Sequence, residues 1–126
     1  MDRVKLATAL MVILILALIG LEMYLNKSFT ELDAHAQRIY DLVTRGDWFE
    51  AMKEANSLKD KYIEIEKKCF MFIHHHNLKD IESSIERTLI YIKNQDYLGY
   101  LLENSNLTSE IKHLKDEEIP VFKNIF

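Results

Sequence analysis

Three consecutive histidines, His74 to His76, are the residues of this chain that first suggest chemistry, because imidazole is the commonest metal ligand among side chains. Successive side chains on a helix point about 100° apart, so the three imidazoles cannot converge on one ion. A helical site needs ligands at positions i and i+4, and the residue four after His74 is Leu78. One of the three could ligate a metal only together with His35, His113 or a carboxylate from another helix. The pattern therefore favours a polar helix end, with no metal and no cofactor.

The other reactive side chains are better explained by structure than by catalysis. Cys69 falls on an apolar stripe, where a thiol is a poor nucleophile, and as the single cysteine of the chain it excludes an intrachain disulfide. The sequence has no Gly-rich phosphate loop, no nucleophile motif and no convergent pair of carboxylates. Asp47 and Asp96 fit helix caps instead. We therefore expect no enzymatic activity.

The elements that position these residues begin with an apolar run, Leu6 to Leu21, which is sixteen residues long and carries no charge. With its neighbours it reaches about twenty residues, the length that crosses a hydrocarbon core. A secretory cleavage site needs two small residues that flank one other residue, and Ala17 and Gly20 do not have that spacing. A lipoprotein signal would need a cysteine where Leu21 stands. The run predicts an uncleaved membrane anchor.

Basic residues on the two sides of this run predict its orientation. Arg3 and Lys5 precede the span, whereas the first basic residue after it is Lys27, which follows Glu22. The positive-inside rule then puts the N-terminus in the cytosol. We expect a single-pass protein of the cell membrane, with a cytosolic stub and anchor at residues 1–27 and an extracytoplasmic domain at residues 28–126.

The composition restricts the fold and the partners. The formal charge is −4, and residues 1–21 carry a net charge of +1, which leaves −5 for the rest of the chain. An acidic domain is a poor ligand for nucleic acid and for anionic headgroups. Three glycines and one proline are too few for the turns of a sheet. The predicted class is therefore all-α.

Apolar spacings of three and four residues divide the chain into helices. A continuous helix is expected from about Lys5 to Arg45, although Ser28 could cap a separate helix, and Gly46 ends it. Asp47 caps the next helix, which extends to Phe72, unless Cys69 to Ile73 form a short strand. The inward stripes expected for the first two soluble helices are Phe29, Leu32, Ala36, Ile39 and Val43, and then Trp48, Ala51, Ala55, Leu58, Tyr62, Ile65, Cys69 and Phe72.

The last two helices are expected to begin at the caps Asn77 and Asp96, and Pro120 ends regular structure. Their expected inward positions are Leu78, Ile81, Ile85, Leu89 and Ile92, and then Tyr97, Tyr100, Leu101, Leu107, Ile111 and Leu114. The half-apolar tail after Pro120 is expected to dock on the apolar segment Phe70 to Ile73 or to serve a partner. The candidate partner surface is Phe122, Ile125, Phe126 and His75.

A shift of 49 residues superimposes the two halves of the soluble part. The apolar stripe of 29–43 falls on that of 78–92, and Arg38 and Glu54 fall on Arg87 and Glu103. Any two heptad stripes in phase agree at a shift of seven heptads, so the apolar match alone is weak. The pattern predicts a four-helix unit of two antiparallel helical hairpins, arranged as a bundle or as a stack similar to tetratricopeptide repeats.

The chain also resembles a known family. The features that carry the resemblance are the N-terminal span, Gly46-Asp47-Trp48, Ile85-Glu86-Arg87 to Tyr91-Ile92-Lys93, Asp96 and Lys123-Asn124-Ile125-Phe126. On these features the chain is similar, over essentially its full length, to small bacterial membrane-anchored proteins described as domain of unknown function 4363. The resemblance implies an all-helical, single-span protein of Gram-positive bacteria, with another small membrane protein as its partner. It implies no activity.

Three functions compete on this evidence. The first is a membrane-anchored extracytoplasmic interaction or scaffold module, which belongs to a complex with another membrane protein. The second is a helical bundle that senses a small ligand and acts through a partner, since the chain shows no output domain of its own. The third is a histidine-dependent metal-binding protein. The sequence leaves the oligomeric state open.

Overall fold

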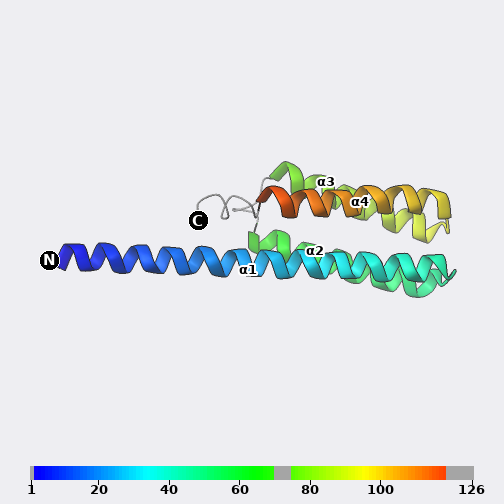
Figure 1. Cartoon of the computed structure of the whole chain (residues 1–126). Helices are drawn as coiled ribbons and strands as arrows, with labels where there is room; N and C mark the ends of the chain where they lie inside the picture. Colours follow the sequence, from blue (N-terminus) through cyan, green and yellow to red (C-terminus); the bar gives the residue numbers. More distant parts are fainter. Residues whose placement is uncertain (1, 70–74, 119–126) are drawn as a thin grey trace.

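A computed structural model describes residues 2–69 and 75–118, and every element in that part of the chain is an α-helix (Figure 1). The all-α class is thus confirmed. The first expected helix is also confirmed as one unbroken helix, in which Ser28 is a buried interior residue and not a cap. The helices are α1 (Asp2–Thr44), α2 (Trp48–Cys69), α3 (His75–Lys93) and α4 (Tyr97–Glu118).

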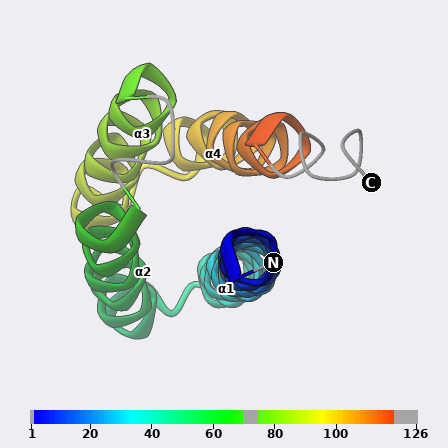
Figure 2. The ribbon, with the colours of Figure 1, turned by 90° about the vertical axis from the view of Figure 1, so that its left-hand side faces the viewer.

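The four helices form an antiparallel bundle. Each helix packs against two neighbours, in the cyclic order α1, α2, α3, α4, and α4 packs back against α1. Seen end-on, the helices lie at the corners of a square (Figure 2). Because α1 and α4 close the ring, the two hairpins form a bundle and not an open repeat stack.

The bundle has two different ends. Both short turns, 45–47 and 94–96, lie at one end, which we call the distal end (Figure 1). The other end is the proximal end, and α1 is the one described helix that continues beyond it. In the described part of the chain, α1 is the one helix long and apolar enough to cross a membrane. Its most apolar window has a mean hydropathy of 2.6 and is not buried by the rest of the protein.

Among the described side chains the core follows the predicted stripes except at Tyr97; Cys69 and Phe72, also expected to face inward, lie outside these side chains, and one predicted helix start is wrong. Tyr97, which we expected to point inward, is 45% exposed because it is the first residue of α4, beyond the last full layer of the core. Asn77 is not the cap of the third soluble helix, because α3 already begins at His75. Nothing in the histidine run breaks a helix, and the first-turn N–H groups need no helical partner. Fully buried side chains of the core include Phe29, Leu32, Ile39, Leu58, Tyr62, Ile65, Ile81, Ile92, Tyr100, Leu107, Ile111 and Leu114.

The two hairpins repeat each other in atomic detail. At the first turn Gly46 has φ 79°, and the N–H of Glu50 donates to Asp47 Oδ1 at 3.2 Å. At the second turn Gln95 has φ 53°, and the N–H of Gly99 donates to Asp96 Oδ1 at 3.0 Å. The backbone hydrogen bonds around the two turns also correspond at a shift of 49 residues. The structure thus supports the repeat beyond the match of heptad phase.

Gly99 shows why the second hairpin departs from the first at one position. A Cβ atom at Gly99 would lie 2.5 Å from two ring carbons of Tyr91, closer than packed atoms allow. The first hairpin has Glu50 at this position, and Leu42 in place of Tyr91. The bulkier ring of the second hairpin therefore requires a glycine opposite it.

The hairpins are joined through α2 and α3. The hydroxyl of Tyr62 donates to the carbonyl oxygen of Leu78 in the first turn of α3. Burial raises the pKa of this phenol, so it remains a neutral donor. On the surface, Lys59 of α2 pairs with Glu86 of α3 at 2.8 Å. Apolar packing, this buried hydrogen bond and the surface ion pair thus connect α2 to α3.

The core assignment predicts the effect of truncation. Leu58→Ala or Ile65→Ala should lower the free energy of unfolding by about 2–5 kcal/mol, because each side chain is buried and leaves a cavity. Lys67→Ala, at an exposed site on the same helix, should change it by less than about 0.5 kcal/mol. Guanidinium denaturation of the full chain in detergent, followed by circular dichroism, measures both. Equal losses at the core and surface sites would contradict the packing.

Candidate functional site

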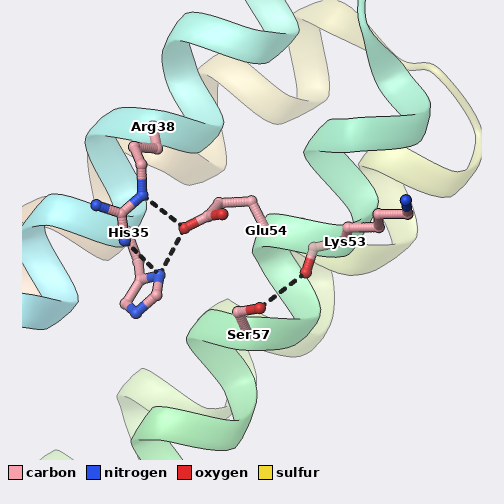
Figure 3. Close-up of polar contacts among 5 residues, drawn as sticks. All are labelled: His35, Arg38, Lys53, Glu54 and Ser57. Atoms are coloured by element: carbon pink, nitrogen blue, oxygen red, sulfur yellow. Dashed lines mark hydrogen bonds and ion pairs between the residues drawn. The ribbon is translucent and has the colours of Figure 1, made fainter.

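A polar cluster joins α1 to α2 near the distal end (Figure 3). Glu54 of α2 points toward α1, and its Oε1 atom lies 2.8 Å from Arg38 Nε and 2.6 Å from His35 Nδ1. The side chains of His35 and Glu54 are 19% and 22% exposed, whereas Arg38 is 55% exposed. The cluster is therefore a partly buried ion pair with an imidazole on its inner side.

The distances assign the proton of the imidazole. A nitrogen 2.6 Å from a carboxylate oxygen must carry a hydrogen, so His35 Nδ1 donates to Glu54. Nδ1 then has no lone pair for Arg38 Nη2, which lies 3.0 Å away. Burial of Glu54 favours its neutral form, but the hydrogen bonds from Arg38 and His35 outweigh that effect and lower its pKa. Glu54 is thus held ionised as an acceptor.

The second hairpin contains the equivalent ion pair. Arg87 Nε donates to Glu103 Oε1, and the side chain of Glu103 is only 10% exposed. Ser84 stands at the position of His35, fully buried, and its hydroxyl has no hydrogen-bond partner within the described part of the chain. The Arg–Glu pair thus recurs in both hairpins, whereas the histidine does not, and in each hairpin the pair cross-links the two helices.

The structure tests the metal hypothesis only for His35 and His113, because the side chains of His74 to His76 lie outside the described structure. His35 is bound to Glu54 near the distal end, whereas α3 begins with His75 at the proximal end. Among the side chains that the structure describes, no three His, Cys, Asp or Glu residues gather to hold a metal ion. His74 lies outside the described residues.

The structure does not describe the side chains of the predicted partner surface. His75 is the first residue of α3, but its side chain is outside the described structure, as are Phe122, Ile125 and Phe126. The segment Phe70 to Ile73, the expected acceptor of the tail and the site of the alternative strand, is outside it too. These residues stay predictions.

A surface that sequence reasoning missed lies at the distal end. Large apolar side chains are exposed there within two helical turns of the hairpin turns, and Phe49, Leu98 and Leu102 are 71%, 74% and 77% exposed. Phe49 and Leu98 are equivalent positions of the repeat, and Leu98 and Leu102 are neighbours at i and i+4 on α4. We call Leu98 and Leu102 on α4 the distal apolar surface; Phe49 is exposed at the same end but lies on α2, diagonally across the bundle from α4, and Ile90 lies on α3.

One comparison with known proteins identifies a family. The model of the family described as Domain of unknown function (DUF4363) matches residues 19–125. The chain belongs to this family. The DUF4363 match includes both hairpins and also the end of the apolar run of α1. No curated protein and no solved structure matches the chain.

The signal for the distal apolar surface was present in the sequence. Phe49, Leu98 and Leu102 are large apolar residues that do not fall on the predicted inward stripes. Apolar residues off the predicted stripes are either covered by another part of the protein or exposed to solvent, and only the structure distinguishes these two cases. In this DUF4363 protein they are exposed.

The polar cluster predicts a pH dependence of stability. The lowered pKa of Glu54 contributes stability that is present above the carboxyl's ordinary pKa of 4.5 and is lost as the pH falls through its folded value. Glu54→Gln should therefore cost about 1 kcal/mol at pH 7 and reduce the loss of stability between about pH 5 and pH 3. Denaturation midpoints across this range measure the effect.

The matched control is Glu50→Gln, because Glu50 is 49% exposed and meets only Lys53, at 3.4 Å within α2. It should change stability by less than about 0.5 kcal/mol at either pH. A Glu54→Gln variant whose acid denaturation runs parallel to that of the unmodified protein would mean that the cluster does not hold the carboxylate ionised.

Proposed function

We infer that this protein is a membrane-anchored helical interaction module, which presents the distal apolar surface to a partner protein. The observation that carries the inference is the single helix α1, whose first half is apolar and exposed while its second half forms one side of the bundle core. A helix without a break connects the two parts, so the bundle is held at a fixed height and direction above the anchor.

The continuity of α1 supports an anchor over a cleaved signal sequence. Cleavage near Leu21 would cut the chain inside the helix, just before the buried residue Leu25. Leu21 and Tyr24 also pack against the core, so the end of the apolar run belongs to the folded bundle as well. Arg3 and Lys5 before the run favour a cytosolic N-terminus and an extracytoplasmic bundle.

The length of α1 limits what can cover the distal apolar surface. From Glu22 to Thr44 the helix rises about 35 Å, so lipid of the anchoring membrane cannot reach the distal end. The occupant is therefore a protein that extends on the order of 30 Å from the same membrane.

The chemistry of that partner follows from the surface. Leu98 and Leu102 expose no hydrogen-bonding group. Large apolar anchors with a polar rim are typical of protein interfaces. We therefore expect a partner with an apolar patch, in a complex of membrane proteins, and the net negative charge of the bundle argues against nucleic acid.

Cysteine labelling tests the orientation. Asn56→Cys in a Cys69→Ser background introduces one exposed thiol on α2. A membrane-impermeant maleimide should label it on intact cells to the same extent as after lysis. Labelling that requires lysis would show that the bundle is cytosolic. Release of a soluble, shortened chain would show that the apolar run is a cleaved signal sequence and not an anchor.

Site-specific crosslinking tests the binding surface. A benzophenone side chain in place of Leu98 should form an adduct with one protein of native membranes, whereas the same group at Ile63, an apolar site at mid-height on α2 with 38% exposure, should not. Leu102→Ser should weaken the adduct from position 98 about tenfold, as for a central interface residue worth 1–2 kcal/mol. An adduct between two copies would identify a second copy as the occupant. Equal adducts at both positions, or none, would contradict the proposed surface.

A further inference from the structure

One face of α1 continues the core beyond the proximal end of the bundle. Leu18, Leu21 and Leu25 follow at spacings of three and four and extend the stripe that includes Phe29. Leu25 is 2% exposed, and Leu21 and Leu18 are half-buried. Met23, on the opposite side of the helix, is 68% exposed. At Leu18 and Leu21 this apolar face of α1 therefore continues past the proximal end of the bundle, and no described helix lies opposite these two residues.

The end of α4 lies next to this face. Lys68 Nζ, near the end of α2, lies 5.7 Å from the centre of the Tyr24 ring. The proximal end of the bundle therefore lies beside Tyr24 along the axis of α1. Figure 1 shows α4 ending at the same height as α2. Because α4 packs against α1, the chain leaves Glu118 beside the segment of α1 that precedes Tyr24.

The segment that follows has the length and pattern to cover that face. Eight residues, 119–126, span about 12 Å as a helix and at most about 29 Å extended. Leu21 and Leu18 lie about 5 and 9 Å beyond Tyr24 along the axis of α1, within that reach. Phe122, Ile125 and Phe126 have the i, i+3, i+4 spacing that puts large side chains on one side of a helix.

We propose that residues 121–126 pack with Phe122 and Ile125 against Leu18 and Leu21 of α1 and add one layer to the proximal end of the core. The segment is attached to α4, so it reaches this face at a high effective concentration and without the entropy cost of association. A separate partner would have to pay that cost. The tail residues then belong to the fold, and recognition is left to the distal apolar surface. The inference does not depend on the proposed function.

Disulfide formation tests the packing in the full chain, in detergent and in liposomes. In a Cys69→Ser background, Leu21→Cys combined with Ile125→Cys, or with Phe122→Cys, should give a disulfide within one chain upon mild oxidation. The control is Met23→Cys with the same partners, since residues 21 and 23 are about 200° apart on the helix and a disulfide needs Cβ atoms about 4 Å apart. Most of the Leu21 pairs and few of the Met23 pairs should be oxidised.

Thiol reactivity provides a second measurement that needs no disulfide. Leu18→Cys and Met23→Cys are compared in the same background, with and without residues 119–126. Deletion should make the thiol at position 18 several-fold more reactive and leave that at position 23 unchanged. Equal oxidation of the Leu21 and Met23 pairs, or a position-18 thiol indifferent to the deletion, would overturn the proposal. If the deletion instead abolishes the distal adduct at normal stability, the segment binds the partner.

Discussion

One constraint determines the rest of this structure: α1 buries one apolar stripe along its second half and leaves its first half uncovered by the bundle. Buried residues of α1 begin at Leu25 and continue to Val43, whereas the residues before Leu21 have no described helix beside them. The other helices have 22, 19 and 22 residues, about half of the 43 residues of α1. The height of the bundle is thus matched to the buried half of α1, and the exposed half is free for another apolar environment.

The bundle meets this constraint by using one hairpin twice. Each hairpin has a left-handed residue after its first helix, an aspartate cap before its second, and an Arg–Glu pair near the turn. The pairs fix the register of two helices at a set distance from the turn, while the apolar stripes supply most of the stability. The differences, such as Ser84 for His35 and Gly99 for Glu50, adapt each hairpin to its own packing and leave the common frame unchanged.

The same frame explains why exposed apolar groups gather at the distal end. Phe49 and Leu98 face away from the core on the outer sides of α2 and α4, so the fold imposes no burial on them. Large apolar residues at such positions contribute nothing to the packing of the bundle, and water around them is unfavourable. Exposed apolar residues of this size are available for contact with another protein, which is the role that we propose for Leu98 and Leu102.

The sequence by itself determined the helical class, the unbroken first helix, both aspartate caps, the hairpin repeat and nearly every core position. These features depend on neighbours within a few residues, and spacings of three and four record them directly. The predictions of Asn77 as a helix cap and of Tyr97 as an inward residue were wrong, and both lie at helix ends, where periodicity carries little information. Only the tertiary structure decided that the ring of helices closes through α1 and α4, that Glu54 meets both His35 and Arg38, and that Phe49, Leu98 and Leu102 face solvent. Each of these depends on which helix faces which across the bundle, and a stripe gives the direction of the core without identifying the helix on its other side.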